Sequence, residues 1–336
     1  MKNNKINVGI FGFGRIGKIH YKNLASNPNV NVKTVADPFF ENTNDEYGDT
    51  VFVKDGQDII DDAEIQAVYI CSPTDSHITW INEAAKAGKD IFCEKPISFS
   101  DEETLAAYEV VKENNVKFQL GVNRRFDPNF STVKGRIKDG AIGETQLLSI
   151  VSRDPEAPPI SYVEKSGGLF FDMMIHDFDM ARFIVGSEVS EVYATGDALI
   201  NSDIKEYNDV DTAVVTLKFQ NGAIGTITNS RQAVYGYDQR LEVFGSKGAV
   251  EVSNETNDRL KISTEEGIQS SKPMYFFLER YEKAYVVEDL AFIEAILNDT
   301  EIPVGFIDGI MAQRLAFAAN ESLKNNSPVK VEEFKG

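Results

Sequence analysis

The segment Gly12-Phe13-Gly14-Arg15-Ile16-Gly17 constrains the fold of this chain more than any other feature. It follows an apolar run at residues 5–11, which predicts a strand buried on both faces, and precedes a predicted helix that ends near residue 27. In this context the first glycine allows a tight turn, the second lets the backbone approach a pyrophosphate, and the third lets helix and strand pack closely. The segment therefore predicts a dinucleotide site at the start of an α/β fold.

The next predicted strand, residues 31–36, ends in an acid, Asp37. A carboxylate at this position accepts hydrogen bonds from both ribose hydroxyls of an adenosine. It also repels the 2′-phosphate of NADP, which a lysine or an arginine would attract. The sequence therefore predicts NAD as the cofactor in preference to NADP. The alternative interpretation is that the glycines are simple turn residues and that Asp37 is solvated.

Strands and helices alternate up to about residue 122, as in βαβ units with a parallel sheet. Further strands are predicted at residues 67–71, 91–93 and 117–121, and helices at residues 76–87 and from Asp101 onward. We therefore expect an N-terminal NAD-binding Rossmann domain over residues 1–122.

The pattern changes after about residue 125. A helix near residues 129–138 precedes β-rich runs, for which we predict strands at residues 189–194, 212–219, 223–230, 240–244 and 249–252. Short turns such as Asn221-Gly222 fit an antiparallel meander better than crossovers. We expect a substrate-binding and oligomerisation domain over residues 123–336, of α+β type with an open, mostly antiparallel sheet. Its final helices, near residues 275–298 and 305–325, can pack back on the first domain.

Composition excludes several classes of protein. The 336 residues contain 34 Lys and Arg against 53 Asp and Glu, a net charge of −19. A polyanion is repelled by nucleic acid and by anionic membranes, and no apolar run is long enough to span a bilayer. The basic N-terminus lacks the apolar core of a signal peptide, so we expect a cytoplasmic protein. Two cysteines and three scattered histidines predict neither a disulfide framework nor a metal site.

Two predicted strand ends carry candidates for the cofactor site, because open α/β sheets bind ligands at the carboxyl ends of their strands. After one strand come Ser72, Pro73 and Thr74, with His77 opening the next helix. A neutral imidazole there can bond a ribose or a phosphate, although His77 can equally be an ordinary helix-start residue. After the next strand come Glu94 and Lys95, followed by Pro96, which fixes the local chain.

Residues 171–180, FDMMIHDFDM, predict a helix with Asp172, His176 and Asp179 on one face. Histidine has an intrinsic pKa suited to a general base at neutral pH, and an acid one helical turn away can orient it. This face is therefore a candidate catalytic wall, in which Asp179 can be a structural residue only. The alternative is an ordinary solvated face.

Several motifs together resemble one known family, the glucose–fructose oxidoreductase / inositol 2-dehydrogenase family. The resemblance runs almost end to end, and its order and spacing are more specific than any single piece. The motifs are Gly12–Gly17, Glu94-Lys95-Pro96, Asn123-Arg124-Arg125-Phe126-Asp127, Gly168 with Asp172, His176 and Asp179, Tyr235-Gly236-Tyr237-Asp238 before LEVFGSKGAVEV, and Tyr275–Ile296 with Glu288-Asp289, this last resembling the inositol dehydrogenase branch.

The resemblance implies NAD(P)-dependent oxidation of a secondary alcohol on a cyclic polyol or sugar. By motif, Lys95, Asp172 and His176 correspond to its catalytic group, and Arg124 and Tyr235 fall where inositol dehydrogenases contact the polyol. One departure concerns the preferred stereoisomer. Ser152 and Asp154 occupy positions where myo-inositol dehydrogenases tend to have His and Asn. Exchanging an amide for the Asp154 carboxylate replaces a donor by an acceptor at a candidate substrate contact.

The leading hypothesis is therefore an NAD-dependent inositol 2-dehydrogenase of inositol catabolism. A sugar dehydrogenase or reductase of the same family is the first alternative. A non-catalytic NAD-binding sensor is the second, and the presence of Lys95, Asp172 and His176 together speaks against it. Family members are often tetramers built through the open sheet face, so we expect a homotetramer in which that face is apolar enough to bury.

Overall fold

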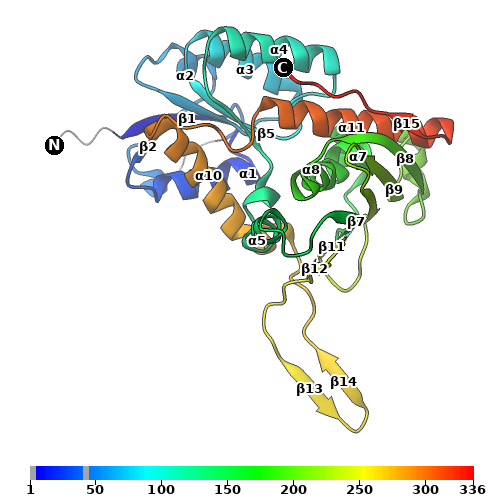
Figure 1. The fold of residues 1–336 in the computed structure, drawn as a ribbon. Coiled ribbons are helices and arrows are strands. Elements are labelled where there is room, and N and C mark those ends of the chain that lie inside the picture. Colours follow the sequence, from blue (N-terminus) through cyan, green and yellow to red (C-terminus); the bar gives the residue numbers. More distant parts are fainter. Residues whose placement is uncertain (1–4, 41–44) are drawn as a thin grey trace. The chain divides into compact units, whose positions relative to one another are not determined.

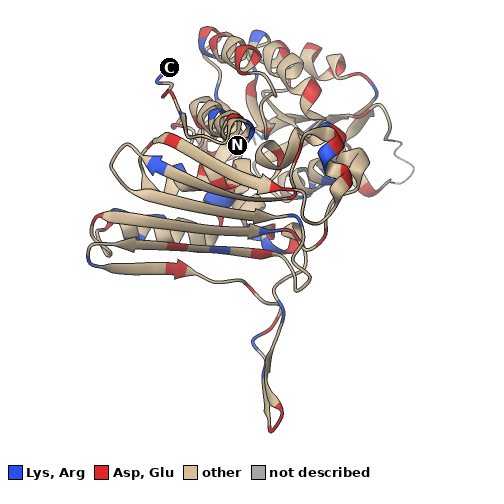
Figure 2. Cartoon of the chain, turned by 90° about the vertical axis from the view of Figure 1, so that its right-hand side faces the viewer, with Lys and Arg blue, Asp and Glu red and all other residues tan. Residues whose placement is uncertain are grey.

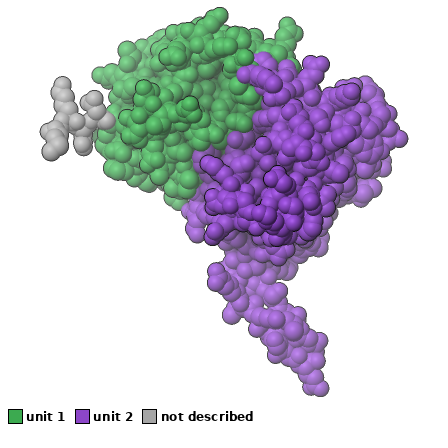
Figure 3. All heavy atoms as spheres, in the orientation of Figure 1, with its two compact units in different colours: residues 1–123, 284–310, 336 green, residues 124–283, 311–335 purple. Residues whose placement is uncertain are grey.

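The computed structural model describes residues 5–40 and 45–336. The chain divides into two compact units (Figure 3). Unit 1 consists of residues 1–123, 284–310 and 336, and unit 2 of residues 124–283 and 311–335. The chain thus passes from unit 1 to unit 2 after Asn123, close to the predicted domain boundary. Residues 284–310 belong to unit 1 again. No helix of the described residues is long and apolar enough to cross a membrane.

Unit 1 contains a six-stranded, fully parallel sheet in the order β3-β2-β1-β4-β5-β6 (Figure 1). Its strands are β1 (Ile6–Phe11), β2 (Val30–Ala36), β3 (Val51–Val53), β4 (Ala67–Ile70), β5 (Asp90–Glu94) and β6 (Phe118–Gly121). The connecting helices are α1 (Arg15–Ala25), α2 (Gln57–Asp61), α3 (His77–Lys86) and α4 (Asp101–Glu113), and most of α10 (Glu282–Leu297) also belongs here. The order is that of a Rossmann fold and confirms the prediction for this domain.

Burial in unit 1 follows from the parallel arrangement. All four residues of β4 are buried, as expected for a strand with helices over both faces. Val8, Ile10, Tyr69 and Phe92 of the sheet share one apolar core with Phe292 of α10. This core holds the carboxyl ends of β1, β4 and β5 in fixed positions, and those ends carry the cofactor-site candidates.

Unit 2 contains a seven-stranded sheet in the order β12-β11-β7-β10-β9-β8-β15. Its strands are β7 (Thr145–Arg153), β8 (Val189–Asp197), β9 (Thr212–Phe219), β10 (Ile224–Ser230), β11 (Asp238–Gly245), β12 (Gly248–Val252) and β15 (Val329–Lys330). The predicted mostly antiparallel sheet is confirmed, but it is not a pure meander. β7, which the sequence patterns did not predict, lies between β10 and β11 and pairs with β10 in parallel.

The helices of unit 2 are α5 (Pro128–Lys138), α6 (Ile160–Ser166), α7 (Gly168–Asp172), α8 (Met174–Val185), α9 (Phe277–Arg280) and most of α11 (Phe306–Asn325). Two predicted helices are each broken in two. The expected helix over residues 171–180 is divided at Met173, and the one over residues 275–298 at Tyr281. Unlike these two, the helix predicted over residues 129–138 forms as expected. Asp127 caps α5 by accepting from the backbone N–H groups of Asn129 and Phe130.

One face of the unit 2 sheet carries exposed apolar side chains on five neighbouring strands, and Figure 2 looks toward this sheet. These side chains are Leu147, Tyr193, Val214, Ile224 and Phe244. Leu147 is directly opposite both Ile224 and Phe244 in the strand register, so the three form a contiguous patch. A two-stranded ribbon, β13 (Lys261–Thr264) and β14 (Gly267–Ser270), projects from the same unit, and all its residues are exposed (Figure 1).

Candidate active site

The glycine loop has the geometry that a dinucleotide requires. Gly12 has a φ of +87°, and an added Cβ would lie 2.8 Å from the backbone of Cys71 and Ser72. A Cβ on Gly17 would lie 2.1 Å from the carbonyl oxygen of Gly12, so helix and strand are in direct contact. Nothing lies within 4 Å of a Cβ built on Gly14, the N-cap residue of α1. This open backbone at a helix N-terminus fits a pyrophosphate group.

Asp37 lies beside this loop at the end of β2. Its Oδ2 accepts from the backbone N–H of Phe13 at 2.7 Å, and its Oδ1 accepts from those of Phe39 and Phe40 at 2.8 and 3.0 Å. The side chain is half-buried. The carboxylate therefore ties β2 to the glycine loop, and its negative charge lies at the edge of the pyrophosphate site.

His77 connects the two other loops of the cofactor half. Its Nε2 lies 2.9 Å from the carbonyl oxygen of Ser72, and its Nδ1 lies 2.8 Å from that of Pro96. Burial lowers the pKa of His77, while the two carbonyls oppose that shift. The imidazole of His77 therefore connects the loop that holds Ser72-Pro73-Thr74 to the segment that holds Glu94-Lys95. Its predicted contact with a ribose or phosphate stays a prediction.

Lys95 follows the last residue of β5, as expected from the sequence, and is half-buried. The Lys95–Pro96 peptide bond is cis. The backbone N–H of Lys95 donates to Oε2 of Glu94 at 3.3 Å. Lys95 belongs to unit 1, whereas Asp172 and His176 belong to unit 2.

Asp172 and His176 are the two positions that remain accessible in an otherwise buried stretch. Among residues 169–182, all described, every other residue is buried. The break at Met173, after two glycines with positive φ, separates the short helix that carries Asp172 from the helix that carries His176. An ordinary solvated face would expose more of its neighbours, so this arrangement favours the interpretation as a site wall.

The carboxylate of Asp172 is fixed by two partners that the sequence did not predict. Oδ2 accepts from Nη1 of Arg231 at 2.8 Å, and Oδ1 accepts from the hydroxyl of Tyr162 at 2.8 Å. Arg231 is almost fully buried, 1% exposed. Its position directly after the predicted strand over residues 223–230 is the one signal in the sequence that could have identified it.

Asp154 belongs to the same polar cluster. Burial raises the pKa of Asp154 to about 6, against the lowering effect of Arg231 and with a smaller upward contribution from Asp172. Its backbone is fixed to the end of β10, donating to the carbonyl of Ser230 and accepting from the N–H of Ala233. A half-buried carboxyl that titrates near neutrality can be a donor or an acceptor toward a hydroxyl.

Arg124 is buried and has interior partners. Its Nη1 lies 2.5 Å from Oδ1 of Asp177, and its guanidinium lies over the ring of Tyr281. Asp177, which the sequence analysis did not single out, also accepts from Asn229 at 2.9 Å. The same kind of pairing applies to Asp179.

Asp179 binds Arg125 through both carboxylate oxygens, at 2.8 and 2.5 Å. It is 1% exposed, so its part in the fold is structural, the role left open for it from the sequence.

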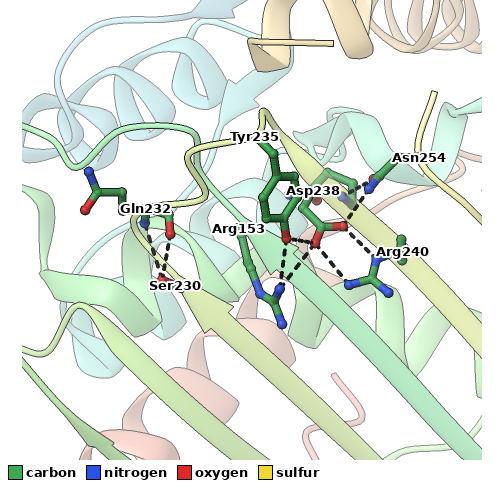
Figure 4. A network of polar contacts seen from close by, with 8 residues as sticks. Arg153, Ser230, Gln232, Tyr235, Asp238, Arg240 and Asn254 are labelled. Atoms are coloured by element: carbon green, nitrogen blue, oxygen red, sulfur yellow. Dashed lines mark hydrogen bonds and ion pairs between the residues drawn. The ribbon is translucent and has the colours of Figure 1, made fainter. Parts of the chain in front are cut away.

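Tyr235 lies in a polar network where β7 ends and β11 begins (Figure 4). Its hydroxyl donates to Oδ2 of Asp238 at 2.5 Å and accepts from Nη1 of Arg153 at 2.9 Å. Asp238 in turn accepts from Arg240 and Asn254. Tyr235 remains 38% exposed, so its ring is available to a ligand while its hydroxyl is fixed.

These features define the chain as an NAD-binding oxidoreductase with a Rossmann domain followed by a mixed-sheet domain. The chain belongs to the GFO/IDH/MocA family. The family's "Oxidoreductase family, NAD-binding Rossmann fold" domain matches residues 6–122, and its "GFO/IDH/MocA C-terminal domain" matches residues 130–251.

Similar proteins cover nearly the whole length of the chain. It is 49% identical to an uncharacterized oxidoreductase, YrbE, of Bacillus subtilis, over 98% of this chain and 97% of that one. It is 42% identical to the myo-inositol 2-dehydrogenase of Thermotoga maritima, over 98% and 99%. The structure of scyllo-inositol dehydrogenase from Lactobacillus casei with bound NAD(H) and scyllo-inositol matches with a TM-score of 0.90 at 31% identity, over 97% and 99%.

Proposed function

We propose that this protein is an inositol 2-dehydrogenase, which oxidises a secondary alcohol of a cyclic polyol with NAD. The observation that carries the proposal is the exposure of Asp172 and His176 alone within residues 169–182, in a chain with a fitting dinucleotide loop. The names of the relatives from Thermotoga maritima and Lactobacillus casei support the substrate class.

Each proposed catalytic residue has a separate task. NAD, when bound, supplies the hydride acceptor. His176 takes the hydroxyl proton as the alcohol is oxidised, because a neutral imidazole is an effective base near neutral pH. Lys95 stabilises the oxygen on which negative charge develops. Asp172, fixed by Arg231 and Tyr162, orients the imidazole or a substrate hydroxyl and stabilises the imidazolium.

Asp154 and Tyr235 are the proposed contacts with the remaining hydroxyls. The pKa of Asp154 near 6 gives it either hydrogen-bonding role, and Tyr235 offers a half-exposed ring. Arg124 stays a predicted polyol contact. Because its guanidinium is bound to Asp177, we propose that Arg124 acts chiefly by fixing that carboxylate.

A sugar dehydrogenase or reductase is the second candidate, favoured by one observation. Ser152 is buried and donates to Gln239 at 3.0 Å, and Asp154 is a carboxyl where the resemblance suggests an amide. The Asp154 carboxyl alters the donor and acceptor pattern offered to a ring of hydroxyls, whereas the buried Ser152 can act only through Gln239.

We also propose a cytoplasmic homotetramer that serves inositol catabolism. The contiguous apolar patch of Leu147, Ile224 and Phe244 on the open sheet face supports burial of that face between subunits. Sedimentation or light scattering of the wild type and of Ile224→Lys would test the assembly.

The decisive experiment for the activity measures initial rates with myo-inositol, scyllo-inositol and glucose, each with NAD and with NADP. The proposal expects the highest kcat/KM with an inositol and NAD. A higher kcat/KM with glucose would favour the sugar dehydrogenase or reductase. If no polyol or sugar is oxidised, the result would favour a non-catalytic NAD-binding protein.

A further inference from the structure

His20, one of three histidines in the chain, is fully buried in α1 and lies between two carboxylates. Its Nδ1 lies 2.6 Å from Oδ1 of Asp289 in α10, and its Nε2 lies 3.1 Å from Oε1 of Glu94 at the end of β5. All three residues belong to unit 1. A neutral imidazole has a single N–H to donate, whereas each of the two carboxylates accepts a hydrogen bond. Because each ring nitrogen of His20 faces a carboxylate oxygen, the geometry favours an imidazole that is protonated at both nitrogens.

The contacts continue from His20 to Lys95. Oε1 of Glu94 faces His20, and Oε2 of Glu94 accepts from the backbone N–H of Lys95 at 3.3 Å. At the other end, Oδ2 of Asp289 accepts from Nδ2 of Asn23 at 2.8 Å. A single hydrogen-bonded chain thus joins helices α1 and α10 to the backbone of the proposed catalytic lysine.

The Glu94 side chain is also fixed by packing. A Cβ added to Gly121 of β6 would lie 3.1 Å from both the carboxyl carbon and Oε1 of Glu94. Glycine at that position leaves the space in which the carboxylate meets His20. On the ring face, His20 packs against Phe92, with centroids 4.9 Å apart. These contacts leave the Glu94 carboxylate little freedom to turn away.

The electrostatic surroundings favour the charged imidazole. Burial by itself lowers the pKa of His20, but Asp289 and Glu94 outweigh it and raise that pKa well above its ordinary value. The titratable groups that face His20 from the neighbouring elements are Glu94 of β5, Asp289, Glu288 and Tyr285 of α10, and Tyr69 of β4, while the thiol of Cys71 lies near the two carboxylates. Burial raises the pKa of Glu288, Tyr69 and Cys71, which favours their neutral forms. The charge that balances Glu94 and Asp289 is then that of His20.

We propose that His20, as a buried imidazolium, is a positioning residue that holds the Glu94–Lys95 segment in the geometry for catalysis. The proposal rests on the proposed function, because it assigns Lys95 to the reaction. His20 itself touches neither the substrate nor the cofactor. It acts through Glu94, and losing its proton removes one of the two donated hydrogen bonds.

The protonation state is measured without turnover. With only three histidines, long-range ¹H–¹⁵N spectra of histidine-labelled protein resolve each ring, and His20→Gln and His176→Ala assign the signals. We expect both ring nitrogens of His20 to carry protons at pH 8. A neutral tautomer of His20 at pH 7 would overturn the proposal, whether or not any polyol is oxidised.

Turnover then tests the positioning role. His20→Gln should lower kcat roughly tenfold or more while the Kd for NADH changes less than about threefold, as expected when a charge-assisted contact behind a catalytic group is lost. The matched control is Lys89→Gln, which removes a buried cation that donates to the carbonyls of Asp62 and Ile65 elsewhere in unit 1. It should lower the melting temperature and leave kcat nearly unchanged. Equal kcat losses in the two variants would contradict the proposal.

Asp289→Asn provides a nearly isosteric variant if His20→Gln does not fold. It removes the carboxylate that raises the pKa of His20 more than Glu94 does, so that pKa should fall. Because the imidazolium is the positioning form, kcat should then decline on the alkaline side at a lower pH than in the wild type. The ring signals of His20 should titrate over that same range. An unchanged kcat profile, with the ring titrating, would refute the link from His20 to Lys95. Failure of all polyol oxidation in the wild type would instead refute the proposed function alone.

Discussion

Arg231 and Asp172 form an ion pair with Nη1 and Oδ2 2.8 Å apart, and their side chains are 2% and 15% exposed. Taking both charges out of water is costly, so such a pair is weak evidence for stability by itself. Its effect is to fix one carboxylate oxygen of Asp172, while Tyr162 fixes the other. The carboxylate of Asp172, which stays partly accessible, therefore has one orientation.

Arg231→Met should destabilise the protein by about 3–5 kcal/mol, because the carboxylate of Asp172, of which only 15% is exposed, loses its charged partner, and should also lower kcat. Tyr162→Phe, the control, removes one hydrogen bond to the same carboxylate and should cost about 1 kcal/mol. Urea unfolding and kcat at saturating substrate check both variants. If Arg231→Met unfolds at lower urea but keeps its kcat, the ion pair serves the fold alone.

Asp37→Ser should weaken NAD binding and narrow the preference for NAD over NADP. The carboxylate opposes a 2′-phosphate, and it also orders the glycine loop through the N–H of Phe13. The ratio of kcat/KM values for the two cofactors provides the measurement. Equal efficiencies in the wild type would show that this carboxylate does not select the cofactor.

Lys95→Ala should lower kcat about 10²–10³-fold, the typical loss when one preorganised charge at a developing oxyanion is removed. NADH binding should survive, because the glycine loop, Asp37 and the His77 contacts are untouched. Fluorescence titration with NADH separates the two effects. Near-normal turnover in this variant would remove Lys95 from the mechanism.

Local patterns predicted the Rossmann half well, since its signals lie in short stretches of sequence. Gly12, Gly14 and Gly17 each meet a specific steric or functional need, and Asp37 follows its strand as expected. The antiparallel character of the second sheet could also be predicted. β7 could not, because its parallel pairing with β10 joins residues far apart in the sequence.

Some site residues of unit 2 could likewise be identified from local sequence patterns, and others could not. Asp172 and His176 could be identified from their spacing, although the helix break at Met173 was not expected. Tyr162 and Arg231 were missed because their contact with Asp172 arises from tertiary packing. His20 was passed over for the same reason, since its partner Asp289 lies 269 residues away.

Asp154→Asn should change how stability depends on pH. The pKa of Asp154 is about 6 in the fold, above its ordinary 3.8, so the folded state holds more protons between these values. The free energy of unfolding contributed by this group is therefore present at low pH and is lost as pH rises through 6. Removing the titration should make Asp154→Asn more stable, relative to wild type, at pH 8 than at pH 4.

Thermal unfolding at both pH values measures this difference. The control is Glu265→Gln, which removes an exposed carboxylate from the same unit. A constant difference between Asp154→Asn and wild type at the two pH values would mean that Asp154 ionises as it does in the unfolded chain.

His176 and Asp172 should act as one unit. His176→Ala and Asp172→Asn should each lower kcat steeply, and the double variant should lose far less than the product of the two factors. The reason is that an orienting acid has little left to do once the base is absent. A merely solvated pair would instead give small, additive losses.

The pH profile distinguishes His176 as the base from Asp154, the other candidate group whose pKa lies near neutrality. Turnover should rise with pH as the base loses its proton, and this limb should disappear in His176→Ala but persist in Asp154→Asn. High pH should partly rescue His176→Ala, because hydroxide can replace the missing base. Profiles of wild type, both single variants and the double variant of His176 and Asp172 provide the measurement. If the limb disappears in Asp154→Asn and survives in His176→Ala, then the carboxyl with the raised pKa, and not the imidazole, takes the proton.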